Sequence, residues 1–289
     1  MAIQTATTGN LDNAQRIAIA QCRYTAEHNA PCWNLIESFT LRQGEKQITV
    51  PKVGQMSASS LTDGVDLVDS EDIGMTTTDL TTAEVGLKVI LTKKLLRQEN
   101  EDVFKIVGRQ MGEAIARKRE TDIIALFSAL NGGTVVGADN KYLTMQNAQA
   151  CVAHAKANKF PAPVFFIHHP NAIGYLGNQA AVTMATYGMP EGLSRELLGN
   201  FYRLTINQCT FFESGNIEKI TSYDSGYGVV ASRSAMCHVE SQAVETDREF
   251  DASLRAWELV LTSDYGVFEL DDGYGAGAQY EIGALATNN

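Results

Sequence analysis

One stretch restricts the fold more than any other: residues 97–133, RQENEDVFKIVGRQMGEAIARKRETDIIALFSALNGG, carry the pattern of a single long helix. Apolar residues recur every three or four positions instead of alternating as they do in a strand. Acidic and amide residues at 100–102 suit a helix start and its dipole, and Asn131-Gly132-Gly133 follows as a left-handed stop. The sequence therefore predicts a helix over residues 102–130, about 40 Å long, a strut longer than a small domain needs. Its apolar stripe comprises Val103, Val107, Met111, Ile115, Ile123, Leu126, Phe127 and Leu130.

Charged residues interrupt this stripe in the middle of the predicted helix, where residues 117–122 read RKRETD. A charged helix face normally lies in water or against another molecule. We therefore expect residues 117–122 to face solvent or a partner.

Composition excludes several classes of protein. At 289 residues and 44% hydrophobic, the chain can bury one large core or two modest ones. A net charge of -11 without a cluster of Lys or Arg argues against binding nucleic acid through its phosphates. Neither a secretory leader nor an apolar run long enough for a membrane helix is present. The 5 cysteines lack CxxC spacing and fit reduced thiols, with an intersubunit disulfide as the alternative.

The first third of the chain has too few apolar residues to form a core of its own. Residues 10–24 suit a short helix, and residues 31–39 suit an extended arm whose Trp33 needs a surface elsewhere. Residues 48–53 alternate like a strand, and residues 85–91 look like its antiparallel return. The connection between them, residues 54–84, contains no Lys, Arg, aromatic residue or Pro. We interpret it as a two-stranded projection that contacts a neighbouring subunit, and a disordered surface loop is the alternative.

The second half reads as alternating helices and strands followed by mixed sheet. Residues 144–158 suit a helix, residues 164–168 a buried strand, and Pro170 opens a further helix at its first turn. Residues 246–254 read as a polar turn between strands. The remaining predicted strands cover residues 202–206, 210–213, 228–231, 236–239, 257–261 and 265–270.

The candidates for chemistry are weak. His168 and His169 would start a hydrolase or metal site, with Cys151 and His154 on one helix face, but no accompanying motif is present. We therefore favour a strand-end histidine that caps a turn, and a soluble α/β enzyme using His168 is the alternative. Glycines 273, 275 and 277 suit tail packing better than a nucleotide loop, and the acidic residues of 63–84 lack calcium-loop spacing. We predict no catalytic, cofactor or metal site.

The order of the parts resembles the major capsid proteins of tailed double-stranded DNA bacteriophages, which have the Hong Kong 97 fold. Residues 80–130, LTTAEVGLKVILTKKLLRQENEDVFKIVGRQMGEAIARKRETDIIALFSAL, are similar to the return of an extended loop into a spine helix. Residues 192–214 (GLSRELLGNFYRLTINQCTFFES) and 245–273 (ETDREFDASLRAWELVLTSDYGVFELDDG) add the axial-domain strands and the peripheral-domain turn. The resemblance covers residues 33–280, and it rests on the order and spacing of these motifs.

The resemblance implies an α+β fold with four parts. Residues 1–42 would be an N-terminal arm and residues 43–91 an extended β-hairpin loop. Residues 92–160 and 236–262 would form a peripheral domain around the spine helix, and residues 163–235 and 263–289 a mixed α/β axial domain.

The function implied is a coat protein that assembles as hexamers and pentamers into an icosahedral head. That head would enclose double-stranded DNA without sequence-specific binding, and an acidic wall would hold DNA without gripping it. Portal, scaffolding and decoration proteins would be partners, no cofactor is implied, and the virion, assembled in the host bacterial cytoplasm, would be the location. An encapsulin-like compartment shares the fold and is the alternative.

Three expectations concern contacts between subunits. We expect no isopeptide crosslink, because residues 53–87 contain no Lys and residues 246–257 no Asn, and the arm is too short for a built-in scaffold. Trp33 is expected at an intersubunit contact. We also expect the acidic loop to lie against the basic residues of a neighbour's spine helix. The loop residues are Asp63, Asp66, Asp69, Glu71 and Asp72, and the helix residues are Arg109, Arg117, Lys118 and Arg119.

Overall fold

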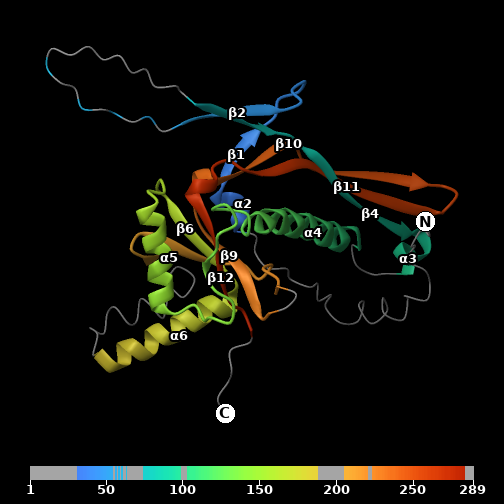
Figure 1. Cartoon of the computed structure of the whole chain (residues 1–289). Helices are drawn as coiled ribbons and strands as arrows, with labels where there is room; N and C mark the ends of the chain where they lie inside the picture. Colours follow the sequence, from blue (N-terminus) through green and yellow to red (C-terminus); the bar gives the residue numbers. More distant parts are fainter. Residues whose placement is uncertain are drawn as a thin grey trace.

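The computed structural model describes residues 31–54, 56, 58, 60, 63, 74–98, 103–187, 205–220 and 223–283. Within these residues the chain forms a four-stranded sheet, a six-stranded sheet and a two-stranded ribbon. One long helix, α4, lies below the four-stranded sheet and reaches the six-stranded sheet at its end, as Figure 1 shows. The α+β class expected from the sequence is confirmed.

Helix α4 (Val103–Leu126) connects two separate apolar clusters. Its 24 residues span about 36 Å. Met111 and Ile115 are buried in one cluster, while Ile123 and Phe127 are buried in another. Residues 127–133 form turns, and the left-handed φ angles of Asn131, Gly132 and Gly133 end the element. The long helix and its glycine stop are confirmed, and the helix acts as a strut between two cores.

The four-stranded sheet has the order β1 (Glu37–Thr40), β10 (Met236–Asp251), β11 (Ala256–Glu269) and β4 (Ala83–Thr92). Strand β1 is parallel to β10, and the other neighbours are antiparallel. One face packs on α4, because the cluster that holds Met111 and Ile115 also contains apolar residues of β4 and β11. Those residues are Leu87, Val89, Leu91, Leu259 and Leu261.

The polar turn predicted at residues 246–254 is wrong. Residues 246–251 pair with residues 256–261 as the outer part of a long hairpin, and the turn is confined to residues 252–255. The prediction failed because residues 241–249 of β10 are exposed on both faces, so their sequence lacks the alternation of a half-buried strand. Strand β11 is likewise one continuous strand where two were predicted.

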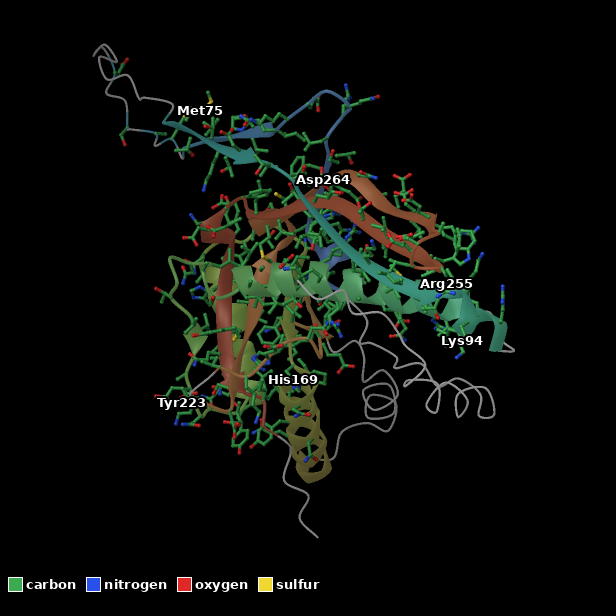
Figure 2. The ribbon with its side chains drawn as sticks, turned by 90° about the vertical axis from the view of Figure 1, so that its right-hand side faces the viewer. Met75, Lys94, His169, Tyr223, Arg255 and Asp264 are labelled. Carbon is green, nitrogen blue, oxygen red and sulfur yellow. The ribbon has the colours of Figure 1, made fainter. Side chains whose placement is uncertain are left out.

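The ribbon consists of β2 (Ile48–Val53) and β3 (Met75–Leu80), paired antiparallel. The expectation that residues 85–91 return against residues 48–53 is wrong, because those residues belong to β4 and pair with β11. The alternating apolar side chains of residues 85–91 pack in the cluster above α4. The partner of β2 in the ribbon is instead β3, which is rich in Thr. In Figures 1 and 2 the ribbon projects from the body, with Met75 toward its outer end.

The six-stranded sheet is covered on both faces. Its order is β5 (Val136–Gly137), β12 (Gly275–Glu281), β9 (Ser225–Ser232), β6 (Val164–His168), β8 (Cys209–Glu213) and β7 (Thr205–Ile206). Helices α5 (Met145–Ala157) and α6 (Pro170–Tyr187) pack on one face, and the end of α4 packs on the other. Thr144 caps α5 by accepting the Asn147 N–H at 3.2 Å, so both helix starts predicted from sequence are confirmed.

The glycine-rich segment near residue 275 is an interior strand of the sheet and not the flexible tail predicted for it. Strand β12 lies between β9 and β5. A Cβ atom at Gly277 would lie 2.6 Å from the Phe127 carbonyl oxygen, and one at Gly275 would lie 2.7 Å from Leu130 Cδ1. Because Gly275 and Gly277 have no side chains, residues 127–130 at the end of α4 can lie close to β12.

Candidate assembly surfaces

The N-terminal arm packs on its own chain. Its described part forms one short helix, α2 (Cys32–Leu35), followed by β1, and is not the continuous extended segment predicted. Cys32 and Ile36 are 0% and 1% exposed within the cluster that also holds Phe127. Ile36, one of the apolar arm residues expected to need a surface elsewhere, finds that surface in its own chain.

Trp33 is the centre of an aromatic cluster inside the chain. Its ring stacks on His238, with 3.8 Å between the ring centroids, and meets the edge of Tyr265 at 5.6 Å. The Arg119 guanidinium carbon lies 4.5 Å from the centroid of Trp33. At this distance the guanidinium makes a cation–π contact, which is strengthened where the groups are shielded from water. Trp33 thus has an intrachain role that the sequence did not reveal, and its role between subunits stays a prediction.

Arg119 is held by the four-stranded sheet above α4. Its Nη2 donates to Glu240 Oε1 at 2.7 Å and to Ser263 Oγ at 2.5 Å, and its side chain is 14% exposed. Tyr265 donates its hydroxyl to Asp122 Oδ2 at 2.8 Å, and burial raises the pKa of this phenol. The four-stranded sheet therefore binds two charged side chains from the middle of α4, those of Arg119 and Asp122.

Glu120 also contradicts the expectation that residues 117–122 face outward. It is 0% exposed, and its Oε2 accepts the Cys32 backbone N–H at 3.1 Å. That bond satisfies one of the free N–H groups at the start of α2. Because Glu120 and Arg119 bind the arm and the sheet, only part of the charged segment remains exposed.

The other predicted helix cations lie on the exposed side of α4. Arg109 pairs with Glu113 at 3.4 Å and Lys118 with Asp122 at 2.5 Å, both within the helix, and Arg117 is exposed. Asp63 is exposed. The remaining acidic residues of that prediction lie outside the described residues, so their contact with a neighbour's helix stays a prediction. They are Asp66, Asp69, Glu71 and Asp72.

The ribbon carries exposed apolar side chains at its outer end, and polar contacts join it to the body. Val53 and Met75, which are register partners, are 53% and 62% exposed. Lys52 pairs with Asp271 at 2.7 Å, and Thr82, just after β3, donates to Asp264 at 2.9 Å. These contacts tie the ribbon to the body, and Figure 2 shows it projecting beyond the four-stranded sheet.

The histidine pair has structural roles. His168 is 0% exposed, and burial together with neighbouring His169 lowers its pKa to about 3. A Cβ atom at Gly228 would lie 2.3 Å from His168 Cδ2, so the ring fills the space against β9. His169 Nδ1 accepts the Asn171 N–H at 3.1 Å and so caps the start of α6, as the turn-capping interpretation predicted. Cys151 contacts the Tyr280 hydroxyl in the core at 3.3 Å, while His154 bonds to Asn158, so neither joins His168 in a site.

Two further observations concern the described residues only. The thiols of Cys32, Cys151, Cys209 and Cys237 are free and buried. No helix among these residues is long and apolar enough to cross a membrane.

Comparison with known proteins shows likeness in structure without likeness in sequence. The sequence matches no protein-family model, and no curated protein matches it significantly. The capsid asymmetric unit of cyanophage Pam1 superposes with a TM-score of 0.69 at 10% identity, covering 91% of this chain and 95% of that one. A chain of Mycobacterium phage Che8 gives 0.69 at 13% identity, with coverage of 89% and 93%. The acid-stable capsid of Helicobacter pylori bacteriophage KHP30 gives 0.67 at 11% identity, with coverage of 97% and 100%.

Each likeness covers about nine-tenths of the chain or more. Because the sequence identity is 10–13%, these structural likenesses are evidence about the fold alone. The chain has the fold of bacteriophage capsid proteins, the Hong Kong 97 fold.

Proposed function

We propose that this chain is a major capsid protein, which assembles as hexamers and pentamers into the icosahedral head of a tailed phage. The observation that carries the proposal is the superposition on phage capsid chains over most of both partners. The proposed head encloses double-stranded DNA. A net charge of -11 supports weak, sequence-independent containment, because an acidic wall does not neutralise phosphates.

The ribbon is the part of the chain that most needs a second copy. The ribbon packs Ile48, Val50 and Leu80 against Cys237 and Val239 of the four-stranded sheet. Its outer end exposes Val53 and Met75, apolar side chains that are normally covered in a finished assembly. We infer that the ribbon lies across a neighbouring subunit and buries these side chains there.

The contact of the acidic loop with a neighbour's spine helix rests on three cations. Arg119 is committed to Glu240 and Ser263, so Arg109, Arg117 and Lys118 remain on the exposed side of α4. Individual exposed ion pairs are worth about 0.2–1 kcal/mol, but each recurs in every subunit of a shell. This complementarity would set the register of the ribbon on its neighbour.

The division into arm, loop, peripheral domain and axial domain is part of this proposal, with two changes of range. Strand β4 is assigned to the peripheral domain because it pairs with β11, and β5 and α5 are assigned to the axial domain because they pack with the six-stranded sheet. In that arrangement portal and scaffolding proteins, and decoration proteins outside the shell, are the partners. Assembly takes place in the host bacterial cytoplasm, and the virion is the final location.

Electron microscopy of the full chain, expressed with and without its scaffolding protein, tests the proposal. Closed icosahedral particles containing DNA after packaging are the expected result. A stable monomer of about 31 kDa under every condition contradicts the proposal. Particles filled with protein cargo and free of DNA favour an encapsulin-like compartment instead.

The charge contact is tested by changing Arg109 and Arg117 to Glu together. We expect lower assembly yield and a weaker dependence of assembly on salt, because the salt-screened attraction is removed. Lys219→Glu, at an exposed cation that pairs with Asp224 outside the spine helix, is the matched control. If yield and salt dependence match the unmodified chain, the ribbon does not use these cations.

A further inference from the structure

We propose that the stack of Trp33 on His238 beside Arg119 is an acid-sensitive latch, which holds residues 31–40 against α4 and loosens them when His238 is protonated. Every group of the latch lies in one chain. The inference therefore goes beyond the proposed shell function and does not depend on it.

The latch joins three elements that are far apart in sequence. Trp33 comes from α2, Arg119 from the middle of α4, and His238 from β10, next to the arm strand β1. The arm is otherwise attached by the β1–β10 pairing, by the bond from Cys32 to Glu120 and by the burial of Ile36. His238 therefore touches the arm twice, through the ring of Trp33 and through its strand neighbour Ser38.

The surroundings of His238 suit a neutral ring and disfavour a charged one. The residue is 4% exposed, and its Nδ1 has no hydrogen-bond partner among the described residues. A neutral imidazole can leave this nitrogen as an unused acceptor, but the imidazolium must donate from both nitrogens. Protonation would therefore bury an N–H group without an acceptor, at the place where the indole ring covers the imidazole.

The charges around His238 act in opposite directions. The Arg119 guanidinium repels an imidazolium, whereas the Glu240 carboxylate attracts it. Glu240 accepts from Arg119 at 2.7 Å, and of these two charges Glu240 has the larger effect on His238. The register partners of His238 on β1 and β11 are Ser38 and Val267, which carry no charge. Tyr265, which also contacts Trp33, is bonded through its hydroxyl to Asp122.

The balance of these effects favours the neutral form while the latch is closed. Burial is the largest cause and lowers the pKa of His238 to about 4. In the loosened arm the pKa returns toward its usual value of about 6.5. The closed state thus binds a proton less readily than the open one, so its stability is complete above pH 6.5 and is lost as the pH falls toward 4.

Two measurements on the full-length chain test the latch. Trp257→Phe leaves Trp33 as the single tryptophan, because the chain has 2. We expect its fluorescence to change between pH 6.5 and 4, while far-UV circular dichroism stays constant. Hydrogen exchange of residues 32–40, corrected for the chemical rate, should show an opening equilibrium that rises about tenfold for each pH unit lost in this range.

The variant His238→Phe keeps an aromatic ring against Trp33 and removes the titration. We expect its fluorescence and its arm opening to be independent of pH between 6.5 and 4. His154→Phe, at a histidine on α5 outside the cluster, is the matched control and should behave as the parent. If His238→Phe and the parent open equally with acid, the latch assignment is wrong.

A second variant tests the same inference if His238→Phe does not fold. Arg119→Met removes the like charge and frees Glu240 to stabilise the imidazolium. We expect the His238 pKa, followed by NMR, to rise toward 6.5 and the acid dependence of arm opening to shrink. An unchanged acid dependence in this variant also overturns the assignment.

Discussion

Single glycine residues determine how closely the end of α4 can approach the six-stranded sheet. Gly277→Ala places a methyl group 2.6 Å from a backbone oxygen of Phe127, where no flexible side chain can move aside. We expect a loss of about 1–3 kcal/mol in the free energy of unfolding of the unassembled chain, measured by urea denaturation. Gly112→Ala, on the exposed face of α4 with no atom within 4 Å, should instead stabilise the chain by about 0.5–1 kcal/mol. Equal effects at the two positions would contradict this packing.

Two neighbouring cations of α4 should differ sharply in their contribution to stability. Arg119→Met leaves Glu240 without its partner in a half-buried position, so we expect a loss of about 1–3 kcal/mol. Lys118→Met removes only an exposed pair with Asp122, within one helix, and should cost less than about 0.5 kcal/mol. Denaturation midpoints of the two variants provide the test, and a larger loss for Lys118→Met would refute the assignment of Arg119 to the interior.

The buried His168 should make the chain acid-sensitive. Its folded pKa of about 3 lies below the unfolded value of about 6.5, so acid stabilises the unfolded chain. We expect His168→Leu to reduce the loss of stability between pH 6.5 and 3, by up to about 1.4 kcal/mol for each pH unit. His154→Gln, which alters a half-exposed histidine on α5, should leave this slope unchanged. The same slope in the His168→Leu variant and the parent would disprove the effect.

At the scale of elements, the ribbon is attached to the body by the packing of its inner residues and by one ion pair. Lys52→Gln removes its ion pair with Asp271, and one exposed pair is worth about 0.2–1 kcal/mol. We therefore expect amide exchange in β2 and β3 to accelerate about 1.4- to 5-fold, with little change in global unfolding. Lys46→Gln, at an exposed lysine before β2, is the control. Uniform exchange rates in both variants would show that the ion pair does not hold the ribbon.

Sequence predicted the elements that carry their own start and stop signals. Helix α4 has its apolar stripe and glycine stop, α5 its Thr144 cap, and α6 its Pro170. It failed for β3, the outer part of β10 and β12, whose residues are Thr-rich, exposed on both faces or glycine-rich. Their strand state is imposed by partners distant in sequence, so no local pattern records it.

The same limit applies to the cluster formed by Trp33, Arg119 and His238. Trp33 and Arg119 were both selected from the sequence, but as contacts for other subunits. That they meet each other follows from the attachment of α2 to α4 at Cys32 and Glu120, and from the pairing of β1 with β10, which joins residues about 200 positions apart. His238 gave no sequence pattern at all, because a histidine within an apolar strand is indistinguishable from any other core residue until its neighbours are known.

At the scale of the whole molecule, folding and assembly should be separable. Val53→Asp and Met75→Asp change side chains that are 53% and 62% exposed in the single chain. We expect the free energy of unfolding to change by less than about 0.5 kcal/mol, as for ordinary surface substitutions. Shell yield, counted by electron microscopy, should fall severely, because charges would be buried under the ribbon on a neighbour. Normal shells from the double variant would contradict the proposed ribbon contact.

The order of strands also bears on how the protein is made. The middle strands of the four-stranded sheet, β10 and β11, and the second strand of the other, β12, all come from the last quarter of the chain. If translation stops before residue 236, the polypeptide contains β1 and β4 but lacks β10 and β11, the two strands that lie between them in the sheet. Truncated products therefore cannot complete either sheet, and in the proposed shell this would exclude unfinished subunits from assembly.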